Sequence, residues 1–340
     1  YDMRVQLTEA KRMGAYQLLR RIGQGGMGEV WVARHSLLAR ATAVKIVSAE
    51  HLATGTKGND APLMRFEREA RATAGLRSPH TVTVFDFGAT GDGQLYYAME
   101  YLEGLDLREL VRRFGPLPAV RAVFLILQAC DSLREAHRQG IIHRDIKPSN
   151  LFLCRLGDNY DFLKVLDFGL ARDLTASGAS IQLTQEGSAA GTPAFMAPEI
   201  ALGTSQAEAT SDLYSLGCVA YWLLTGTDVF EAKAPMQVMF AHAKEKPIPP
   251  SMRTESPIPP DLERIVLWCL EKEPEDRPQT AGELMRALAK LDSFPAWKNE
   301  DAERWWKAHM PDIKSSDEML NPELAPTVKF VRPGEDEALR

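Results

Sequence analysis

The stretch Ile141-Ile142-His143-Arg144-Asp145-Ile146-Lys147-Pro148-Ser149-Asn150 decides the fold, together with Asp167-Phe168-Gly169 further along the chain. Asp145 and Asn150 lie five positions apart, and Asp167 is the acidic residue of the second stretch. Carboxylate and amide oxygens are hard ligands that suit Mg²⁺, and a carboxylate can also accept the proton of a hydroxyl nucleophile. The pattern therefore predicts a site that holds a hydroxyl and two metal ions around a phosphate. Asp145 would be the proton acceptor, and Asn150 and Asp167 the metal ligands.

The order His-Arg-Asp-x-Lys-x-x-x-Asn followed by Asp-Phe-Gly resembles the catalytic core of the protein kinases. A single Asp in a loop is ordinarily a turn residue or a helix cap, but two motifs in this order are typical of that family. The resemblance covers residues 16–291 and is closest to the bacterial eukaryotic-like Ser/Thr protein kinases. It implies an α+β fold with two lobes: a small β-rich N-lobe with one helix, and a larger, mainly helical C-lobe. ATP would lie between them.

The composition of the 340-residue chain is that of an ordinary globular protein, with 45% hydrophobic and 25% charged residues. A net charge of −6 gives no sign of nucleic-acid binding. The four cysteines are far apart and form no C-x-x-C pair, which argues against zinc and fits a reducing cytosol. No apolar run is long enough to span a bilayer. A cytoplasmic protein without a membrane segment is therefore expected, and an anchor outside this chain stays open.

A strand, a turn and a second strand are predicted over 16–22, 23–28 and 29–33. The turn carries a G-x-G-x-x-G pattern formed by Gly23, Gly25 and Gly28. A dinucleotide-binding fingerprint is the alternative, but it needs a helix after the last glycine, and a β-branched and aromatic run follows here. The pattern therefore favours the glycine-rich lid of the kinases, whose backbone amides close on phosphates.

Residues 42–47 read as a strand with one lysine, Lys45, in an apolar run. A lysine that extends its charge to solvent from an edge strand is the alternative. After a glycine-rich hairpin, Ala43-Val44-Lys45 resembles the kinase lysine that binds the α- and β-phosphates. A helix over 63–76 would supply its partner carboxylate. Glu67 and Glu69 compete, because they lie about 200° apart around a helix, and the resemblance favours Glu69.

Two more strands are expected over 82–87 and 95–100, and the stretch that follows resembles the hinge between kinase lobes. Asp106 falls where many kinases place an acid on the ribose, but it could equally be the N-cap of a helix over 107–114. By resemblance Val30 would cover the adenine and Met99 would be the gatekeeper. The implied ATP site comprises Gly23, Gly25, Gly28, Val30, Ala43, Lys45, Met99, Glu100, Leu102 and Asp106.

Helical periodicity marks the second half of the chain. Helices are expected over 119–139, 212–224, 261–270 and 280–291, and a hairpin over 151–165. His137 is interpreted as structural rather than as a ligand. By resemblance, Asp212 would brace the backbone of the catalytic loop and Glu199 would pair with Arg277. Lys147 would neutralise the γ-phosphate during transfer.

A Ser-, Thr- and Gly-rich stretch without periodicity runs from 169 to 197 and resembles an activation loop. Thr192, near its end, would help to define the pocket for the substrate hydroxyl. Arg144 places a permanent positive charge beside Asp145, which a phosphate on the loop could neutralise. Of the loop hydroxyls, Thr184 is favoured as the phosphorylation site, because its distance from Thr192 resembles that of activating threonines in bacterial relatives. The alternative is that these hydroxyls only keep the loop soluble.

The expected organisation is a lead-in over 1–15, a kinase domain over 16–291 and a partly disordered tail over 292–340. Within the domain, 16–100 would be the N-lobe, 100–106 the hinge and 107–291 the C-lobe. The tail would hold a short helix with Trp305-Trp306, which could dock a partner or pack on the C-lobe. The resemblance implies transfer of the γ-phosphoryl group of ATP to protein Ser/Thr residues with Mg²⁺ or Mn²⁺, with homodimers able to autophosphorylate. A pseudokinase scaffold and a small-molecule phosphotransferase are the alternatives.

Overall fold

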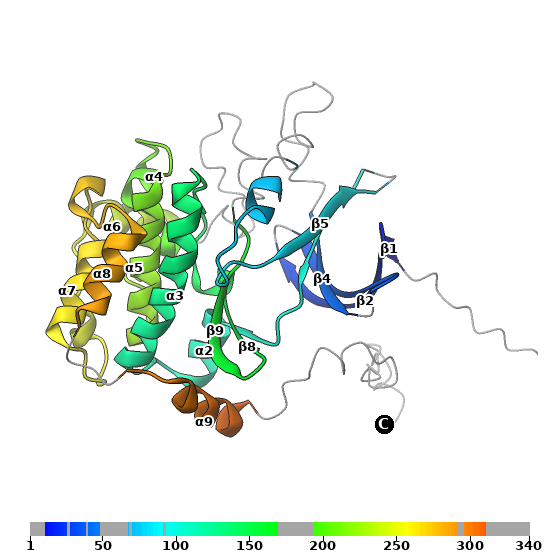
Figure 1. The fold of residues 1–340 in the computed structure, drawn as a ribbon. Helices are drawn as coiled ribbons and strands as arrows, with labels where there is room; N and C mark the ends of the chain where they lie inside the picture. The colour runs from blue at the N-terminus through cyan, green and yellow to red at the C-terminus, as the bar shows by residue number, and fades with distance from the viewer. Residues whose placement is uncertain are drawn as a thin grey trace, which may run out of the picture.

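The computed structural model describes residues 11–25, 28–38, 40–47, 67, 70–90, 93–168, 193–291 and 296–310. It has a β-rich N-lobe beside a larger helical C-lobe (Figure 1). The N-lobe is one antiparallel sheet with the strand order β1-β2-β3-β4-β6-β5. Its strands are β1 (Arg12–Met13), β2 (Tyr16–Gly25), β3 (Gly28–His35), β4 (Ala41–Val47), β5 (Val84–Ala89) and β6 (Leu95–Glu100).

Strand β4 is buried along its whole length, because both of its faces are covered. Ala43 and Val47 belong to a cluster that also contains Tyr97 and Met99 of β6. Val44 and Ile46 belong to a second cluster with Tyr16 and Tyr96. Since side chains alternate along a strand, Lys45 projects on the same side as Ala43 and Val47.

Residues 11–15, expected as part of the lead-in, instead begin the sheet. Met13 of β1 pairs with Tyr16 and is only 2% exposed, because its apolar side chain joins the second cluster. Gly14 makes the turn with a φ of +54°, and a Cβ there would lie 2.1 Å from the Tyr96 hydroxyl. A two-residue strand carries no periodicity that a sequence pattern could reveal.

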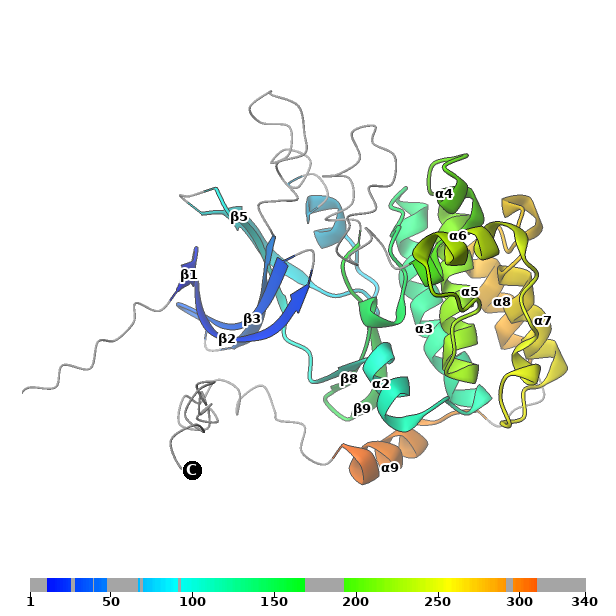
Figure 2. The same ribbon diagram turned by 180° about the vertical axis from the view of Figure 1, so that it is seen from behind.

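The C-lobe surrounds one central helix, α5 (Ala209–Thr225), most of whose residues are buried (Figure 2). A small sheet of β7 (Gly104–Asp106), β8 (Leu151–Leu156) and β9 (Asn159–Val165) faces the N-lobe side. The other helices are α2 (Leu107–Phe114), α3 (Ala119–Arg138), α4 (Pro198–Leu202), α6 (Pro235–Lys244), α7 (Pro260–Cys269), α8 (Ala281–Ala289) and α9 (Asn299–His309).

Helix ends follow local chemistry. Asp106 caps α2, because its carboxylate accepts a hydrogen bond from the backbone N–H of Glu109 at 2.8 Å. After α3, Gly140 takes a φ of +74°, which a glycine adopts without strain. Helix α5 begins three residues earlier than the sequence predicts, where Ser211 Oγ accepts from the backbone N–H of Glu208 at 3.2 Å.

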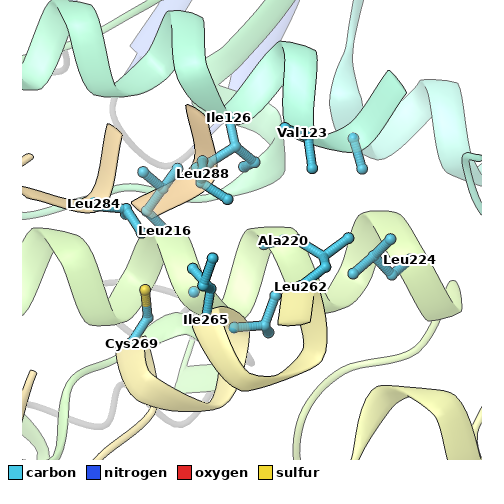
Figure 3. A pocket seen from close by; sticks show the side chains of 13 residues that line it. Val123, Ile126, Leu216, Ala220, Leu224, Leu262, Ile265, Cys269, Leu284 and Leu288 are labelled. Carbon is cyan, nitrogen blue, oxygen red and sulfur yellow. The ribbon is translucent and has the colours of Figure 1, made fainter. Parts of the chain in front are cut away.

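An apolar void of about 20 Å³ lies inside the C-lobe, between α3, α5, α7 and α8 (Figure 3). Its lining includes Val123, Ile126, Leu216 and Leu262, and the volume is about that of one water molecule. A water there would find no polar partners, so the void is a packing gap and not a ligand site. Within the described part of the chain, no helix is long and apolar enough to cross a membrane.

Helix α9 packs beneath the β8–β9 hairpin (Figure 1). Trp306 is 3% exposed, and Trp305 meets Phe114 of α2 edge to face, with ring centroids 4.9 Å apart. The two tryptophans therefore pack on this chain's own C-lobe, which is one of the two roles that the sequence left open. Residues 292–295 and 311–340 lie outside the described residues.

Candidate active site

The catalytic loop brings Asp145, Lys147 and Asn150 together. Lys147 Nζ lies 2.7 Å from Asp145 Oδ2. Asn150 Nδ2 donates to Asp145 Oδ2 at 3.0 Å and to the Asp145 carbonyl oxygen at 2.8 Å. Because the Asn150 nitrogen is used in this way, its amide oxygen is the atom left for a cation. Pro148 begins a single 3₁₀ turn that ends at Asn150. The loop is therefore short, and Asn150 stays close to Asp145.

Asp212, near the start of α5, holds the backbone of this loop. Its Oδ2 accepts from the His143 N–H and its Oδ1 from the Arg144 N–H, both at 2.8 Å. His137 Nε2 lies 2.8 Å from the same Oδ2, so His137 belongs to the bracing group. Arg144 has a φ of +67°, a conformation that is unfavourable for a residue with a Cβ. The hydrogen bond from the Arg144 N–H to Asp212 stabilises Arg144 in this conformation, next to Asp145 in the chain.

His143 links the two motifs, a role that the sequence analysis missed. It is fully buried, and its Nε2 lies 2.7 Å from the Leu166 carbonyl oxygen. Its Nδ1 accepts from the Asp145 N–H at 3.2 Å, which makes Nε2 the donor to Leu166. Its ring lies 4.7 Å from that of Phe168. The sequence offered one signal for this role, which is that His143 stands two residues before the predicted base, Asp145.

Asp167, which follows strand β9, pairs with Lys45 of β4. Lys45 Nζ is 2.5 Å from Asp167 Oδ2, and the Tyr97 hydroxyl donates to Asp167 Oδ1. Burial raises the pKa of Asp167, but the Lys45 charge and the hydrogen bonds from Lys45 and Tyr97 outweigh it and hold the pKa below its usual value. Asp167 is therefore ionised at neutral pH. Burial and the neighbouring Asp167 raise the pKa of Tyr97 well above its usual value, so its hydroxyl stays a donor.

Of the two candidate partners of Lys45, only Glu67 is among the described residues. Glu67 pairs with Arg71 at 3.7 Å, where both side chains are more than 40% exposed. Glu69 lies outside the described residues, as do Thr184 and Thr192 of the loop over 169–192.

Most of the expected nucleotide-binding residues lie on strands of the N-lobe sheet. Strands β2 and β3 stay paired out to Gly25 and Gly28, so the glycine pattern lies at the tip of a hairpin. Val30 packs against the cluster that contains Ala43 and Met99.

Beyond β6, Leu102 is half-buried. The Glu100 Oε1 atom accepts from Lys164 at 2.6 Å and from the Thr83 N–H at 2.7 Å, and the Glu100 N–H donates to the Thr83 carbonyl oxygen at 3.0 Å. The Asp106 carboxylate acts as a helix cap, and burial raises its pKa.

A buried ion pair supports the segment that follows the activation loop. Arg277 donates to Glu199 through its two terminal nitrogens, Nη2 and Nη1, at 2.8 and 3.0 Å, and Ser211 Oγ donates to Glu199 at 2.6 Å. Burial raises the pKa of Glu199, but these hydrogen bonds and the Arg277 charge outweigh it and lower the pKa. Arg277 also donates to the carbonyl oxygens of Glu271 and Lys272, so no donor is left without an acceptor on that side.

The donor set fits Mg²⁺ bound with a nucleotide. Mg²⁺ typically takes one or two protein oxygens and completes its shell with waters and phosphates, and Asp167 and Asn150 offer such oxygens. No group of three or more His, Cys, Asp or Glu side chains that could hold a metal is found in the described ranges. Two protein ligands suit a metal that arrives with its phosphates.

Comparison with known proteins shows the family to which these motifs belong. Residues 16–288 match the family model described as the protein kinase domain. The serine/threonine-protein kinase PknB of Mycobacterium tuberculosis is 42% identical over 279 residues, which are 81% of this chain and 42% of that protein. Serine/threonine-protein kinase pkn3 of Myxococcus xanthus is 38% identical over 278 residues, covering 82% of this chain and 50% of the relative. The chain thus spans half or less of the length of these relatives.

Two solved structures share the fold. A double mutant of the Mycobacterium tuberculosis PknI kinase domain aligns with a TM-score of 0.63 and 25% identity, over 84% of this chain and 98% of that one. Rad53, residues 1–466, aligns with a TM-score of 0.64 and 23% identity, over 80% of this chain and 64% of that one. The two-lobed α+β architecture expected from the sequence is confirmed.

Proposed function

Because this chain belongs to the protein kinase family, we propose that it is a serine/threonine protein kinase, which transfers the γ-phosphoryl group of ATP to hydroxyls of protein substrates. One observation carries the proposal: Asp145, Lys147 and Asn150 form a bonded group, and Asp167, after the next hairpin, pairs with Lys45. The names of the relatives, serine/threonine-protein kinases, support the substrate class.

Each residue has a separate task in the transfer. Asp145 accepts the proton of the attacking hydroxyl, and Lys147 neutralises charge on the transferred group. Lys45 holds the α- and β-phosphates and is itself positioned by Glu69, since Glu67 is paired with Arg71. Asp167 and Asn150 hold Mg²⁺, or Mn²⁺ in its place, and the metal supplies neutralisation of phosphate charge. The hydrogen bonds of Asp212 hold Asp145 in place before substrate arrives.

The nucleotide would lie between the glycine hairpin and the hinge. The carbonyl oxygen of Glu100 and the backbone of Leu102 would bond the adenine, because the Glu100 N–H already donates to the Thr83 carbonyl oxygen. Gly23, Gly25 and Gly28 would approach the phosphates with their amides. Asp106, although it caps α2, has a second carboxylate oxygen that could accept from a ribose hydroxyl.

The four cysteines are free and buried, and buried thiols without disulfides suit a reducing compartment. We place the kinase in the cytoplasm on this ground. Two copies could phosphorylate each other's activation loops, with Thr184 as the acceptor. A phosphate there would lie near Arg144 and add about two negative charges, while Thr192 would border the hydroxyl pocket.

One incubation tests the activity. The protein is mixed with Mg²⁺, γ-labelled ATP and casein, and the labelled residues are identified by phosphoamino-acid analysis. The proposal predicts label on serine and threonine. A pseudokinase would bind nucleotide and label nothing, a small-molecule phosphotransferase would leave casein unlabelled, and predominant phosphotyrosine would refute the substrate class.

Control of the kinase activity by phosphorylation of the activation loop is tested separately. The active protein should carry phosphate in the tryptic peptide over 173–233, and Thr184→Ala should lower turnover by about tenfold, whereas Thr175→Ala is the matched control. A fully active Thr184→Ala protein with no phosphate in that peptide would show that the loop is not the switch.

A further inference from the structure

Tyr97 is a buried tyrosine whose hydroxyl reaches the active-site carboxylate. It lies on β6 directly opposite Lys45 of β4 and is 1% exposed. Its ring packs in the cluster that includes Val47, Val82 and Ala70. A ring enclosed on these sides has no freedom to turn, so the position of the hydroxyl is set by the N-lobe core.

The two oxygens of Asp167 are held by donors of different kinds. Oδ1 accepts from the Tyr97 hydroxyl, and Oδ2 accepts from Lys45 Nζ at 2.5 Å. Lys45 carries its charge on a flexible four-carbon chain and can turn to phosphates when a nucleotide enters. Tyr97 cannot follow, because its ring is packed in the core. If Lys45 turned to the phosphates, Oδ2 of Asp167 would be free, and Oδ1 of Asp167 would still accept from the Tyr97 hydroxyl.

We propose that Tyr97 is a positioning residue, whose hydroxyl holds Asp167 Oδ1 and thereby presents Oδ2 to the Mg²⁺ ion that accompanies the nucleotide. The inference rests on the proposed function. It also accounts for the backbone of Asp167, whose φ of +57° is unfavourable for a residue with a Cβ. A carboxylate anchored at one oxygen keeps its orientation in that conformation.

The competing explanation is that Tyr97 only fills space and that its hydroxyl needs an acceptor because it is buried. The two roles differ in how they depend on metal. A space-filling residue would affect folding stability, or nucleotide affinity in every condition. A positioning residue would affect only the affinity that Mg²⁺ adds.

The test replaces Tyr97 by Phe, which keeps the ring and removes the hydroxyl. Affinity for the non-hydrolysable analogue AMP-PNP is measured by calorimetry in saturating Mg²⁺ and again in EDTA, and the melting temperature is measured for each protein. Tyr97→Phe should weaken binding in Mg²⁺ by about tenfold, the effect of one lost hydrogen bond to a charged group. Its affinity in EDTA should equal that of the wild type.

Tyr96→Phe is the matched control, because Tyr96 is the neighbouring residue on β6 and belongs to the cluster on the other face. It should bind as the wild type does in both conditions. The inference is overturned if Tyr97→Phe keeps the full gain from Mg²⁺, or if it loses the same factor with and without metal. A wild type that binds no nucleotide in either condition would overturn the proposed function as well, so the two failures are distinguishable.

Discussion

Asp212 illustrates how one buried carboxylate can determine the geometry of a catalytic loop. It accepts two backbone N–H groups and contacts His137, and it stabilises Arg144 in a conformation with positive φ. The hydrogen bonds of an ionised carboxylate are stronger than those of neutral groups, so they can offset local backbone strain of about 1–3 kcal/mol. The position of Asp145 therefore depends on a residue that lies outside the catalytic loop.

Lys45 and Glu69 should act as one unit in the proposed mechanism. Lys45→Met and Glu69→Ala should each lower kcat/KM, and the double variant should lose less than the sum of the two losses, because either change alone breaks the pair. Glu67→Ala is the internal control, since Glu67 pairs with Arg71 at the surface. If Glu67→Ala cripples the enzyme and Glu69→Ala does not, the wrong carboxylate has been assigned.

The Glu199–Arg277 ion pair should make the free energy of unfolding depend on pH. The pKa of Glu199 is lower in the folded chain than in the unfolded one, so the stabilisation is complete above about pH 4.5 and is lost as the pH falls through the folded pKa. Glu199→Gln should cost about 3–5 kcal/mol at pH 7, because Arg277 loses its buried counter-charge.

The difference between the unfolding free energies of the wild type and Glu199→Gln should narrow on acidification below about pH 4.5. Urea titrations at several pH values measure both proteins. A difference that stays constant down to pH 3 would contradict the ion pair as the source of the stability.

Some site residues could be predicted from the sequence because their motifs are local. Asp145, Lys147 and Asn150 lie within six positions, and the structure brings them together. Tyr97 could not be predicted in this way, because its partner Asp167 lies 70 residues away. Along β6 the tyrosine reads as one more aromatic residue of a buried strand.

At the scale of elements, the contact of α5 with α7 depends on one glycine. A Cβ at Gly217 would lie 2.6 Å from Cys269 Cβ and 3.3 Å from Leu270 Cδ2. Gly217→Ala should therefore push the helices apart and cost about 1–3 kcal/mol. Gly282→Ala in α8 is the control, because its nearest neighbour would be 3.6 Å away.

Gly282→Ala should stabilise the chain by about 0.5–1 kcal/mol, the ordinary gain of alanine over glycine in a helix. Chemical denaturation of both variants measures the two effects. Destabilisation by Gly282→Ala equal to that of Gly217→Ala would show that the close approach of α5 and α7 is not the cause.

Many elements could be predicted from periodicity, but helices α4 and α6 and strand β7 were not expected. The helices over 119–139, 261–270 and 280–291 lie within a residue or two of the expected ranges. The misses have physical reasons. Strand β1 is too short to carry a period, and β2 continues into the glycine loop because backbone pairing with β3 requires no particular side chain.

At the scale of the whole molecule, residues 296–310 are part of the C-lobe. The indole nitrogens of Trp297 and Trp306 donate to Asp161 at 2.9 and 2.7 Å, and Arg121 of α3 pairs with the same carboxylate at 2.7 Å. Asp161 is fully buried, and its carboxylate accepts four hydrogen bonds from three side chains, two of which belong to the tail. A boundary at residue 291 would leave this group incomplete.

Trp306→Ala should cost about 3–5 kcal/mol, because it removes a large buried side chain and one of the donors to Asp161. Lys307→Ala is the control, since its side chain is 69% exposed, and it should change stability by less than about 0.5 kcal/mol. A chain that ends at residue 291 should melt at a lower temperature than one that ends at 310. Equal melting temperatures would mean that the tail contributes nothing to the fold.

In the proposed chemistry, Asp145 is the group that takes the proton of the substrate hydroxyl. The most direct measurement compares wild type and Asp145→Asn in Mg²⁺ with labelled ATP and casein, together with the dissociation constant for AMP-PNP. Turnover should fall by about 10²–10⁴-fold, and nucleotide affinity should stay unchanged, because no nucleotide contact is lost. An Asp145→Asn protein that keeps more than about a tenth of the wild-type turnover would contradict the proposed chemistry.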